Sequence, residues 1–238
     1  MKKHYVISSL IPIYIVILSL ALIISTVGSR AVTVISENIK SDNRLCIIID
    51  AGHGGVDGGA TSCTGVLESD INLSIALRLN ELVQLLGFKS IMIRDTDCSV
   101  YTEGDSIAAK KVSDLKNRVK IINQCPNATL ISIHQNYYPD SRYSGAQVFY
   151  AKSQQSADLA QRLQILFVDT LNKGSNRKAK RASGIYLMEH ITCPGILVEC
   201  GFLSNYKEET YLRNAEYQKK ISSVIACGCS QYLYNLAS

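Results

Sequence analysis

Two histidines and two glutamates of this 238-residue chain could together bind a metal ion and use it. Three of them come directly after, or just beyond, short apolar runs typical of buried strands, and the fourth precedes an amphipathic segment. The four residues are His53, Glu68, His134 and Glu199. Because chemistry in open α/β sheets collects beyond the carboxyl ends of the strands, we expect these side chains to lie near one another.

The types of these residues favour zinc chemistry. Zinc in a catalytic site takes imidazole nitrogens and often one carboxylate, and it leaves a position for water. A further carboxylate beside such a water can take its proton. Each residue also has an ordinary interpretation: His53 as a loop histidine, Glu68 as a carboxylate favoured by the helix dipole, and His134 as a core histidine. Glu199 is harder to explain in that way, because an acid after an apolar run is costly to bury without a partner.

The glycine-rich loop at 52–59 has two other familiar interpretations, and it fits neither. A dinucleotide-binding loop needs the pattern G-x-G-x-x-G, which fails at Asp57, and a P-loop needs a following Gly-Lys-Ser/Thr. Asp57 would also repel a phosphate. The loop therefore remains a turn that presents His53.

The elements that must position these residues alternate between strands and helices. Short apolar runs predict strands at 45–50, 88–94, 128–133, 146–151, 185–188 and 195–198. Apolar periodicity and capping residues predict helices at 69–86, at 114–124 after an N-cap at Ser113, at 154–172, after a capping box at Asn205 and Glu208, and up to the C-terminus. This alternation predicts a single α/β layered domain, with a largely parallel, mixed central sheet flanked by helices.

The N-terminal segment at 1–30 is predicted to be a transmembrane helix. It carries no charged side chain from Tyr5 to Ser29, and about 20 apolar residues span a bilayer. Two lysines precede it, so the positive-inside tendency keeps the N-terminus in the cytoplasm. The alternative is a signal peptide that is cleaved after export. In both cases we expect a linker at 31–44 and a catalytic domain at 45–238 outside the cytoplasm.

The net charge of the chain excludes few classes of function, but it does not favour nucleic-acid binding. The formal net charge is +5, and five cations cluster between Lys173 and Arg181 in a polar stretch. A nucleic-acid module would need a broader basic face with interleaved aromatic residues. We interpret this basic cluster as a solvated loop. An acidic polymer as the substrate would also fit its positive charge.

Four ordered stretches resemble a known family. IIIDAGHGGVDGGA, GVLESDINL, ISIHQN and ILVECGFLSN are similar to the signatures of the zinc-dependent N-acetylmuramoyl-L-alanine amidases of the amidase-3 type. SGAQVFYA and NRKAKRASGIYL resemble more closely the germination-specific (CwlD-type) amidases of endospore formers. The resemblance spans about residues 45–235. One departure is Ala51, where the family commonly has proline.

The resemblance implies a function and a role for each site residue. One Zn²⁺ would be held by His53, Glu68 and His134, with Glu199 as the catalytic acid and base. The reaction would be hydrolysis of the amide between N-acetylmuramic acid and L-alanine of the peptidoglycan stem peptide, in maturation of the spore cortex. The alternatives are a zinc peptidase that cuts within the stem peptide and a non-catalytic wall-binding domain.

We also expect two further residues to contribute to substrate binding and an accessory protein to assist the enzyme. Asn136 in a His-x-Asn motif and Arg177 in an Asn-Arg motif are candidates for substrate binding, although Asn136 is also suited to capping a turn and Arg177 to a surface role. The absence of a wall-binding module favours membrane tethering or an accessory activating protein. The expected location is the cell membrane of a sporulating bacterium, with the domain on the forespore-cortex side.

Overall fold

The structure is a computed structural model that describes residues 45–125 and 127–237. The segment at 1–30 that is predicted to span a membrane and the linker at 31–44 lie outside the described residues. No helix in the described part of the chain is both long enough and apolar enough to cross a bilayer. The described residues form one unit with its own apolar core.

Six strands form one mixed sheet in the order β2-β1-β3-β6-β4-β5. The strands are β1 (Cys46–Ala51), β2 (Lys89–Met92), β3 (Ala128–Asn136), β4 (Gln147–Tyr150), β5 (Lys180–Arg181) and β6 (Gly195–Phe202). All neighbouring pairs are parallel except β4 and β6, which are antiparallel. The prediction of a single α/β domain with a mixed central sheet is therefore confirmed.

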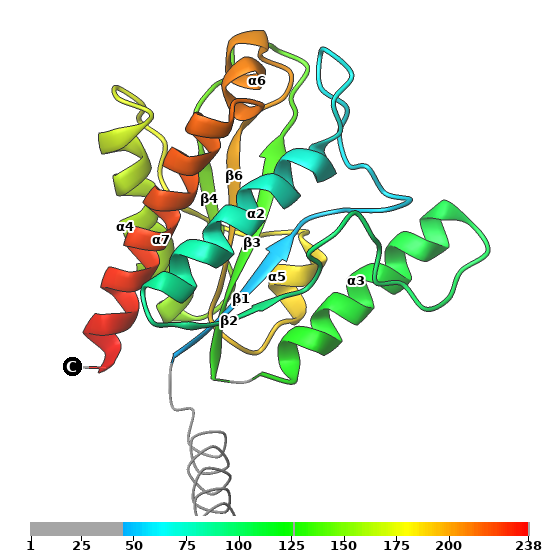
Figure 1. Ribbon diagram of the computed structural model, residues 1–238, viewed down its shortest axis with the longest axis horizontal. Helices are drawn as coiled ribbons and strands as arrows, with labels where there is room; N and C mark the ends of the chain where they lie inside the picture. The colour runs from blue at the N-terminus through cyan, green and yellow to red at the C-terminus, as the bar shows by residue number, and fades with distance from the viewer. Residues whose placement is uncertain (1–44, 126, 238) are drawn as a thin grey trace, which may run out of the picture. The chain divides into compact units, whose positions relative to one another are not determined.

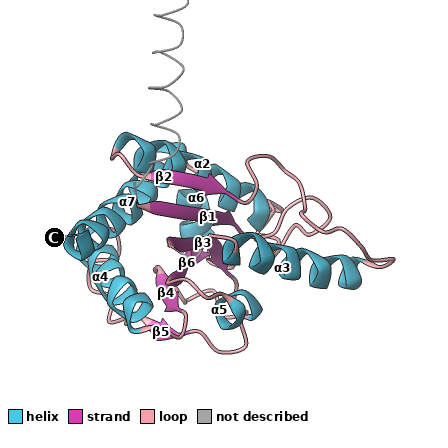
Figure 2. Cartoon of the chain, turned by 90° about the horizontal axis from the view of Figure 1, so that it is seen from below, coloured by secondary structure: helices cyan, strands magenta, loops and turns pink. Residues whose placement is uncertain are grey.

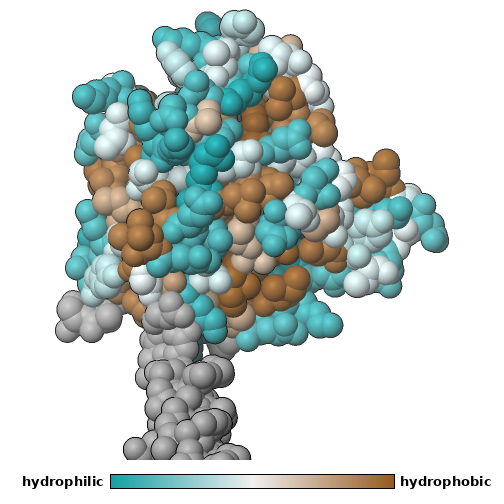
Figure 3. Space-filling view, in the orientation of Figure 1, coloured by the Kyte–Doolittle hydropathy of each residue, from teal (hydrophilic) through white to brown (hydrophobic). Residues whose placement is uncertain are grey.

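Helices cover both faces of the sheet. They are α2 (Glu68–Leu85), α3 (Ile107–Asn123), α4 (Gln154–Thr170), α5 (Tyr186–His190), α6 (Tyr206–Leu212) and α7 (Ala215–Ala237). Figure 1 and Figure 2 show α2, α4 and α7 on one face and α3 and α5 on the other. The outer side of α2 and α7 faces the viewer in Figure 3, where apolar patches are separated by hydrophilic residues. This mixture is expected for helices that bury one side against a sheet.

Side chains alternate between the two faces along the central strands, and this alternation places the polar residues Asp50, His134 and Glu199 on the same face of the sheet. Ile47 and Ile49 of β1 pack into the core beneath α2 and α7, whereas Ile48 packs into the smaller core beneath α5. Because successive side chains of a strand point to opposite faces, Asp50 lies on the same side as Ile48. On β3 and β6, His134 and Glu199 follow Leu130 and Leu197 of the smaller core at even spacing. All three polar residues therefore lie on the face that α3 and α5 cover.

Helix α3 begins seven residues earlier than predicted. Its N-cap is Ser106, whose side chain accepts a hydrogen bond from the backbone of Ala109 at 3.2 Å. Ser113 is not an N-cap; its hydroxyl accepts from the backbone N–H groups of Thr102 and Glu103 and so fixes the preceding loop against the helix. The first turns of α3 are mostly exposed, so they lack the apolar periodicity on which the prediction relied.

The predicted strand at 185–188 is wrong, because this run forms helix α5. A short apolar run does not distinguish a strand from a buried helix, and Leu187 and Met188 are buried beneath the sheet from within a helical turn. A strand forms instead at Lys180–Arg181, in the basic stretch interpreted as a loop, and pairs with β4. Asn205 does cap α6, but Glu208 bonds to other backbone groups and does not complete a capping box.

Candidate metal centre

Three predicted site residues form a cluster at the carboxyl end of the sheet. His53 comes from the loop after β1, Glu68 is the first residue of α2, and His134 lies in β3. The potential ligand atoms of the three side chains lie within 4.8 Å of one another. One carboxylate oxygen of Glu68 lies 3.0 Å from Nδ1 of His134, and the other lies 3.2 Å from Nε2 of His53. The carboxylate therefore sits between the two imidazoles.

The Glu68 carboxylate is held in the ionised state. Its Oε1 accepts from the backbone N–H of Gln135 at 3.1 Å and from the side chain of Asn72 at 3.2 Å, and its Oε2 accepts from the backbone N–H of Ala60 at 3.0 Å. Burial alone would raise the pKa of Glu68, but the hydrogen bonds with His134 and His53 hold that pKa far below its usual range. Asn72 is fully buried, and its contact with Glu68 was not anticipated from the sequence.

The backbone of the His53 loop is fixed by two buried arginines. His53 has a φ of 61°, the one positive φ of a non-glycine residue in the described ranges, and this conformation is costly for a side chain with a Cβ. Arg118 donates from Nη2 to the carbonyl oxygen of His53 at 2.7 Å and from Nη1 to that of Ala51 at 3.0 Å. Arg94 donates to the carbonyl oxygens of Ala51 at 2.8 Å and Gly52 at 3.0 Å. These bonds offset the cost of holding His53 in the left-handed region.

Arg118 is itself held by two acids in the layer between the sheet and α3. It forms ion pairs with Asp50 of β1 and with Asp114 one turn earlier on α3, and the Arg118 and Asp50 side chains are only 3% and 1% exposed. Burial would raise the pKa of Asp50, but Arg118 and a 2.6 Å hydrogen bond from Ser132 hold it below its ordinary value. Asp50 is therefore ionised and balances the buried guanidinium.

Arg118→Met is expected to lower the free energy of unfolding by about 3–5 kcal/mol, because it leaves Asp50 buried without its counter-charge. The matched control is Arg142→Met, which removes an ion pair to Asp140 whose arginine is 90% exposed, and which should leave the free energy of unfolding close to the wild-type value. Urea unfolding followed by circular dichroism measures both. Equal small losses in the two variants would show that Arg118 does not hold the loop.

Asp57 orients the ring of His53. Its Oδ2 lies 2.9 Å from Nδ1 of His53, so that Nε2 faces Glu68. Asp57 is held in turn by Lys111 of α3 at 2.8 Å and by the backbone N–H of Gly59 at 3.1 Å. A carboxylate behind a histidine is a usual arrangement around a metal ligand. From the sequence, Asp57 was interpreted only as a group that would repel phosphate; its place four residues after His53 in the same loop was the available signal.

In the metal-free protein, the free energy of unfolding should fall as the pH rises from about 6.5 to about 9. Burial lowers the pKa of His53, but hydrogen bonds to Asp57 and Glu68 outweigh it and raise this pKa to about 9. A group whose pKa is higher in the folded state stabilises the fold below its unfolded pKa and loses that effect as the pH passes the folded pKa. The loss should be on the order of 2–3 kcal/mol.

Urea titrations of the chelator-treated wild type and of His53→Gln at several pH values test this expectation. The variant should lose most of the dependence on pH between 6.5 and 9, because it lacks the titrating imidazole. An unchanged dependence in His53→Gln would contradict the assignment to His53.

Glu199 lies beside His134 but is not tied to the other three residues. The two residues are direct partners in the pairing of β3 with β6, so Glu199 lies within the strand and not at its end. Its Oε2 is buried and has no hydrogen-bond partner in the described part of the chain. Burial, with a smaller contribution from Glu68, raises the pKa of Glu199 to about 7, although His134 and His53 act in the opposite direction. The group can therefore accept and return a proton near neutral pH.

The cluster fits a zinc ion by the chemistry of its donors. Two imidazoles and one carboxylate are a usual protein ligand set for catalytic zinc. The unpartnered oxygen of Glu199 next to this set points to a missing polar group, such as a water. Gly52 also belongs to the site, because a Cβ at this position would overlap the ring of His134. No side chain other than hydrogen fits between the loop and that ring.

The two candidates for substrate binding lie outside this cluster. Asn136 is the last residue of β3, and its carbonyl oxygen accepts from the backbone N–H of Leu203 at 2.8 Å. Its predicted role in substrate binding remains untested. Arg177 lines a separate cavity beside β4. His190, the remaining histidine of the described residues, is exposed and stacks on Tyr186.

Comparison with known proteins identifies an enzyme family. The family described as N-acetylmuramoyl-L-alanine amidase matches residues 47–231. A germination-specific N-acetylmuramoyl-L-alanine amidase of Bacillus subtilis (strain 168) is 41% identical over 191 residues, which are 78% of each chain.

Two solved structures show the same fold at similar coverage. The CwlD amidase from Clostridioides difficile, in complex with the GerS lipoprotein, is 40% identical with a TM-score of 0.77, over 81% of this chain and 99% of that chain. An N-acetylmuramoyl-L-alanine amidase from Clostridium difficile 630 is 29% identical with a TM-score of 0.69, over 81% of this chain and 98% of that chain. The resemblance that was drawn from the four motifs is thereby confirmed.

Proposed function

This chain belongs to the N-acetylmuramoyl-L-alanine amidase family, and we propose that it works with one zinc ion bound by His53, Glu68 and His134. The reaction of the family is hydrolysis of the amide that joins N-acetylmuramic acid to the L-alanine of the stem peptide. The substrate is therefore peptidoglycan. A bound zinc ion supplies a Lewis acid that polarises the amide carbonyl and lowers the pKa of its water.

Glu199 carries the proton in this reaction. It takes a proton from the attacking water and returns it to the nitrogen of the leaving L-alanine. The second transfer is needed because an amide nitrogen leaves poorly until it is protonated. In the metal-free chain, burial raises the pKa of Glu199 to about 7, so this carboxyl group can accept a proton near neutral pH and can also release it.

The observation that carries the proposal is the buried oxygen of Glu199 that lacks a partner beside the His-Glu-His cluster. A structural carboxylate in such a place would be satisfied by neighbouring donors, as Glu68 is. Glu199 is left available to a group that the protein itself does not supply. In a member of an amidase family, that group is the water that attacks the amide.

Mass spectrometry of digested peptidoglycan tests the bond that is cut. An amidase releases intact stem peptides that begin with L-alanine and leaves glycan strands without peptide. A zinc peptidase with the same ligands would leave part of the stem attached to muramic acid. Fragments of that second kind would contradict the proposed function.

We infer that the substrate in the cell is spore cortex and that an accessory protein assists the enzyme. The germination-specific description of the Bacillus relative supports the first inference, and the lipoprotein in the Clostridioides complex supports the second. A partner at the membrane suits the expectation that the segment at 1–30 places the domain outside the cytoplasm. A pull-down from sporulating cells, followed by activity assays with and without the captured protein, tests this; an unchanged rate would count against an activator.

A further inference from the structure

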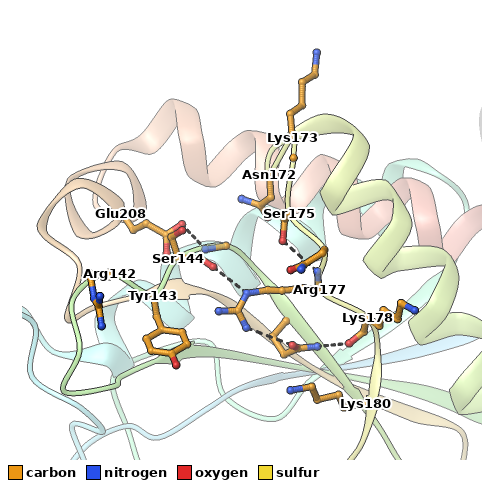
Figure 4. Close-up of a pocket in the computed structure, with 14 residues that line it drawn as sticks. Arg142, Tyr143, Ser144, Asn172, Lys173, Ser175, Arg177, Lys178, Lys180 and Glu208 are labelled. Atoms are coloured by element: carbon orange, nitrogen blue, oxygen red, sulfur yellow. Dashed lines mark hydrogen bonds between the residues drawn. The ribbon is translucent and has the colours of Figure 1, made fainter.

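A second cavity of about 750 Å³ lies on the β4 side of the sheet, away from the His-Glu-His cluster (Figure 4). Its lining is strongly basic and includes one acid. The cations are Arg142, Lys173, Arg177, Lys178 and Lys180, and the acid is Glu208. The activity proposed above does not by itself assign a ligand to this cavity.

Arg177 lines this basic cavity, and its side chain is held in place by three contacts. Its Nε donates to the carbonyl oxygen of Ser144 at 2.9 Å, and its Nη1 lies 3.4 Å from the side-chain oxygen of Gln147. The guanidinium also lies 4.9 Å from the centre of the Phe202 ring, within the range of a cation–π contact. An arginine held on three sides loses little freedom when it binds a further group.

The acids nearest the cavity are already occupied. Glu208 accepts from the backbone N–H groups of Gly145 and Phe202, each at 2.8 Å. Arg142 is paired with Asp140 outside the cavity. Among the described residues, Lys173, Arg177, Lys178 and Lys180 form no ion pair with an acid, and all four line the cavity. The cavity is therefore complementary to an anion.

The register of the sheet places this cavity directly beyond the catalytic glutamate. His134 of β3 pairs with Glu199 of β6, and Glu199 pairs with Gln147 of β4. The three residues are therefore consecutive across the sheet, with strands about 4.8 Å apart. Gln147, which is 2% exposed, is the pairing partner of Glu199 and accepts a 3.4 Å hydrogen bond from Nη1 of Arg177. A group bound to Arg177 would therefore lie on the β4 side of Glu199.

On the side of the metal cluster that faces α3 and α5, the lining is mainly apolar and not basic. A groove of about 380 Å³ extends from His53 and His134 between α3 and α5. Its apolar lining includes Leu115, Ile185, Leu187 and Leu197, and its charged residues pair with one another. The cluster thus separates an apolar groove from a basic cavity.

We propose that the basic cavity binds a carboxylate of the stem peptide and so fixes the direction in which the substrate lies across the cluster. The inference rests on the proposed function. Glu199 must reach the leaving nitrogen, which belongs to the peptide, so the peptide extends from the cluster toward Glu199 and β4. The stem peptide ends in a carboxylate, whereas the muramic acid of the uncut substrate carries none, because its lactyl carboxyl group is held in the amide until hydrolysis. The cations lie on the side where the anionic half of the substrate must be.

Two substrates that differ only in charge test the inference with the purified full-length chain. Soluble peptidoglycan fragments are used with free carboxylates and after conversion of those carboxylates to methylamides. On the free acid, Arg177→Met should lower kcat/KM by about 10- to 100-fold, mainly through KM, as expected for a lost charge-assisted hydrogen bond. On the amidated substrate, the wild type should be slower by a similar factor and the variant should lose little more.

Control variants separate a lost contact from a damaged fold. Arg162→Met removes an exposed arginine of α4 that does not line the cavity, and it should leave both substrates unaffected. Arg177→Lys should recover part of the KM. The exposed pair Lys173→Gln and Lys180→Gln should raise KM severalfold for the free acid alone, even if Arg177→Met fails to fold.

The outcomes distinguish this inference from the proposed function. If the wild type cleaves neither substrate, the proposed function fails. If it cleaves both at equal rates, or if Arg177→Met slows both by the same factor, the amidase stands and the carboxylate site is overturned. A loss that is confined to the free acid supports the site.

Discussion

Glu199→Gln is expected to lower kcat by about 10²- to 10⁴-fold while the zinc content stays at the wild-type level. The amide of glutamine cannot accept the proton of the attacking water or return one to the leaving nitrogen. It has nearly the size of the carboxylate, so the pairing of β6 with β3 and β4 should be retained. In the described part of the chain, the Glu199 side chain forms no hydrogen bond or ion pair with the three proposed ligands, so the metal should remain bound.

Two assays on one preparation measure this effect. Zinc is determined by elemental analysis, and turnover is followed as the release of L-alanine amino termini from peptidoglycan. Glu81→Gln, on the exposed side of α2, is the matched control and should leave both values unchanged. Wild-type turnover in Glu199→Gln with zinc still bound would remove Glu199 from the mechanism.

His134→Ala is expected to lose the metal and, with it, the activity. The substitution removes one of the three proposed ligands and leaves Oε1 of Glu68 without its imidazole partner. Two remaining ligands hold zinc far less tightly than three, so the purified variant should contain little zinc and turn over at background rate. Unlike Glu199→Gln, this variant therefore changes both readings.

His190→Ala provides the comparison for this second variant. The side chain of His190 is exposed and contacts Tyr186, so its loss should change neither zinc content nor turnover. Competition with a chromophoric chelator gives the affinity of each variant. Wild-type zinc affinity in His134→Ala would refute the proposed ligand set.

The sequence predicted the strands that carry the site but placed their ends too early. Apolar runs indicated β3 and β6, and the polar residues after them were expected at the strand ends. Both strands in fact continue, through His134 to Asn136 and through Glu199 to Phe202. A strand can carry polar side chains where one of its faces borders a site, and periodicity of apolar residues does not detect such a stretch.

The supports of the cluster could not be predicted, because they join residues that are distant in the chain. Arg118 binds the carbonyl oxygen of His53 across 65 positions, and Arg94 binds that of Gly52 across 42. Nothing local in the helix or the loop indicates such a pairing. The same holds for Arg177, whose motif was visible but whose place beside Gln147 depends on the order of β6, β4 and β5.

We propose that the His-Glu-His cluster holds the zinc ion on which amide hydrolysis depends. The most direct test removes zinc from the purified chain with a chelator, returns it in measured steps, and follows L-alanine amino termini released from peptidoglycan. We expect no release from the metal-free chain and a rise in proportion to bound zinc, up to about one ion per chain. Full release by the metal-free chain, or a plateau that is independent of bound zinc, would contradict the proposed role of zinc in the hydrolysis.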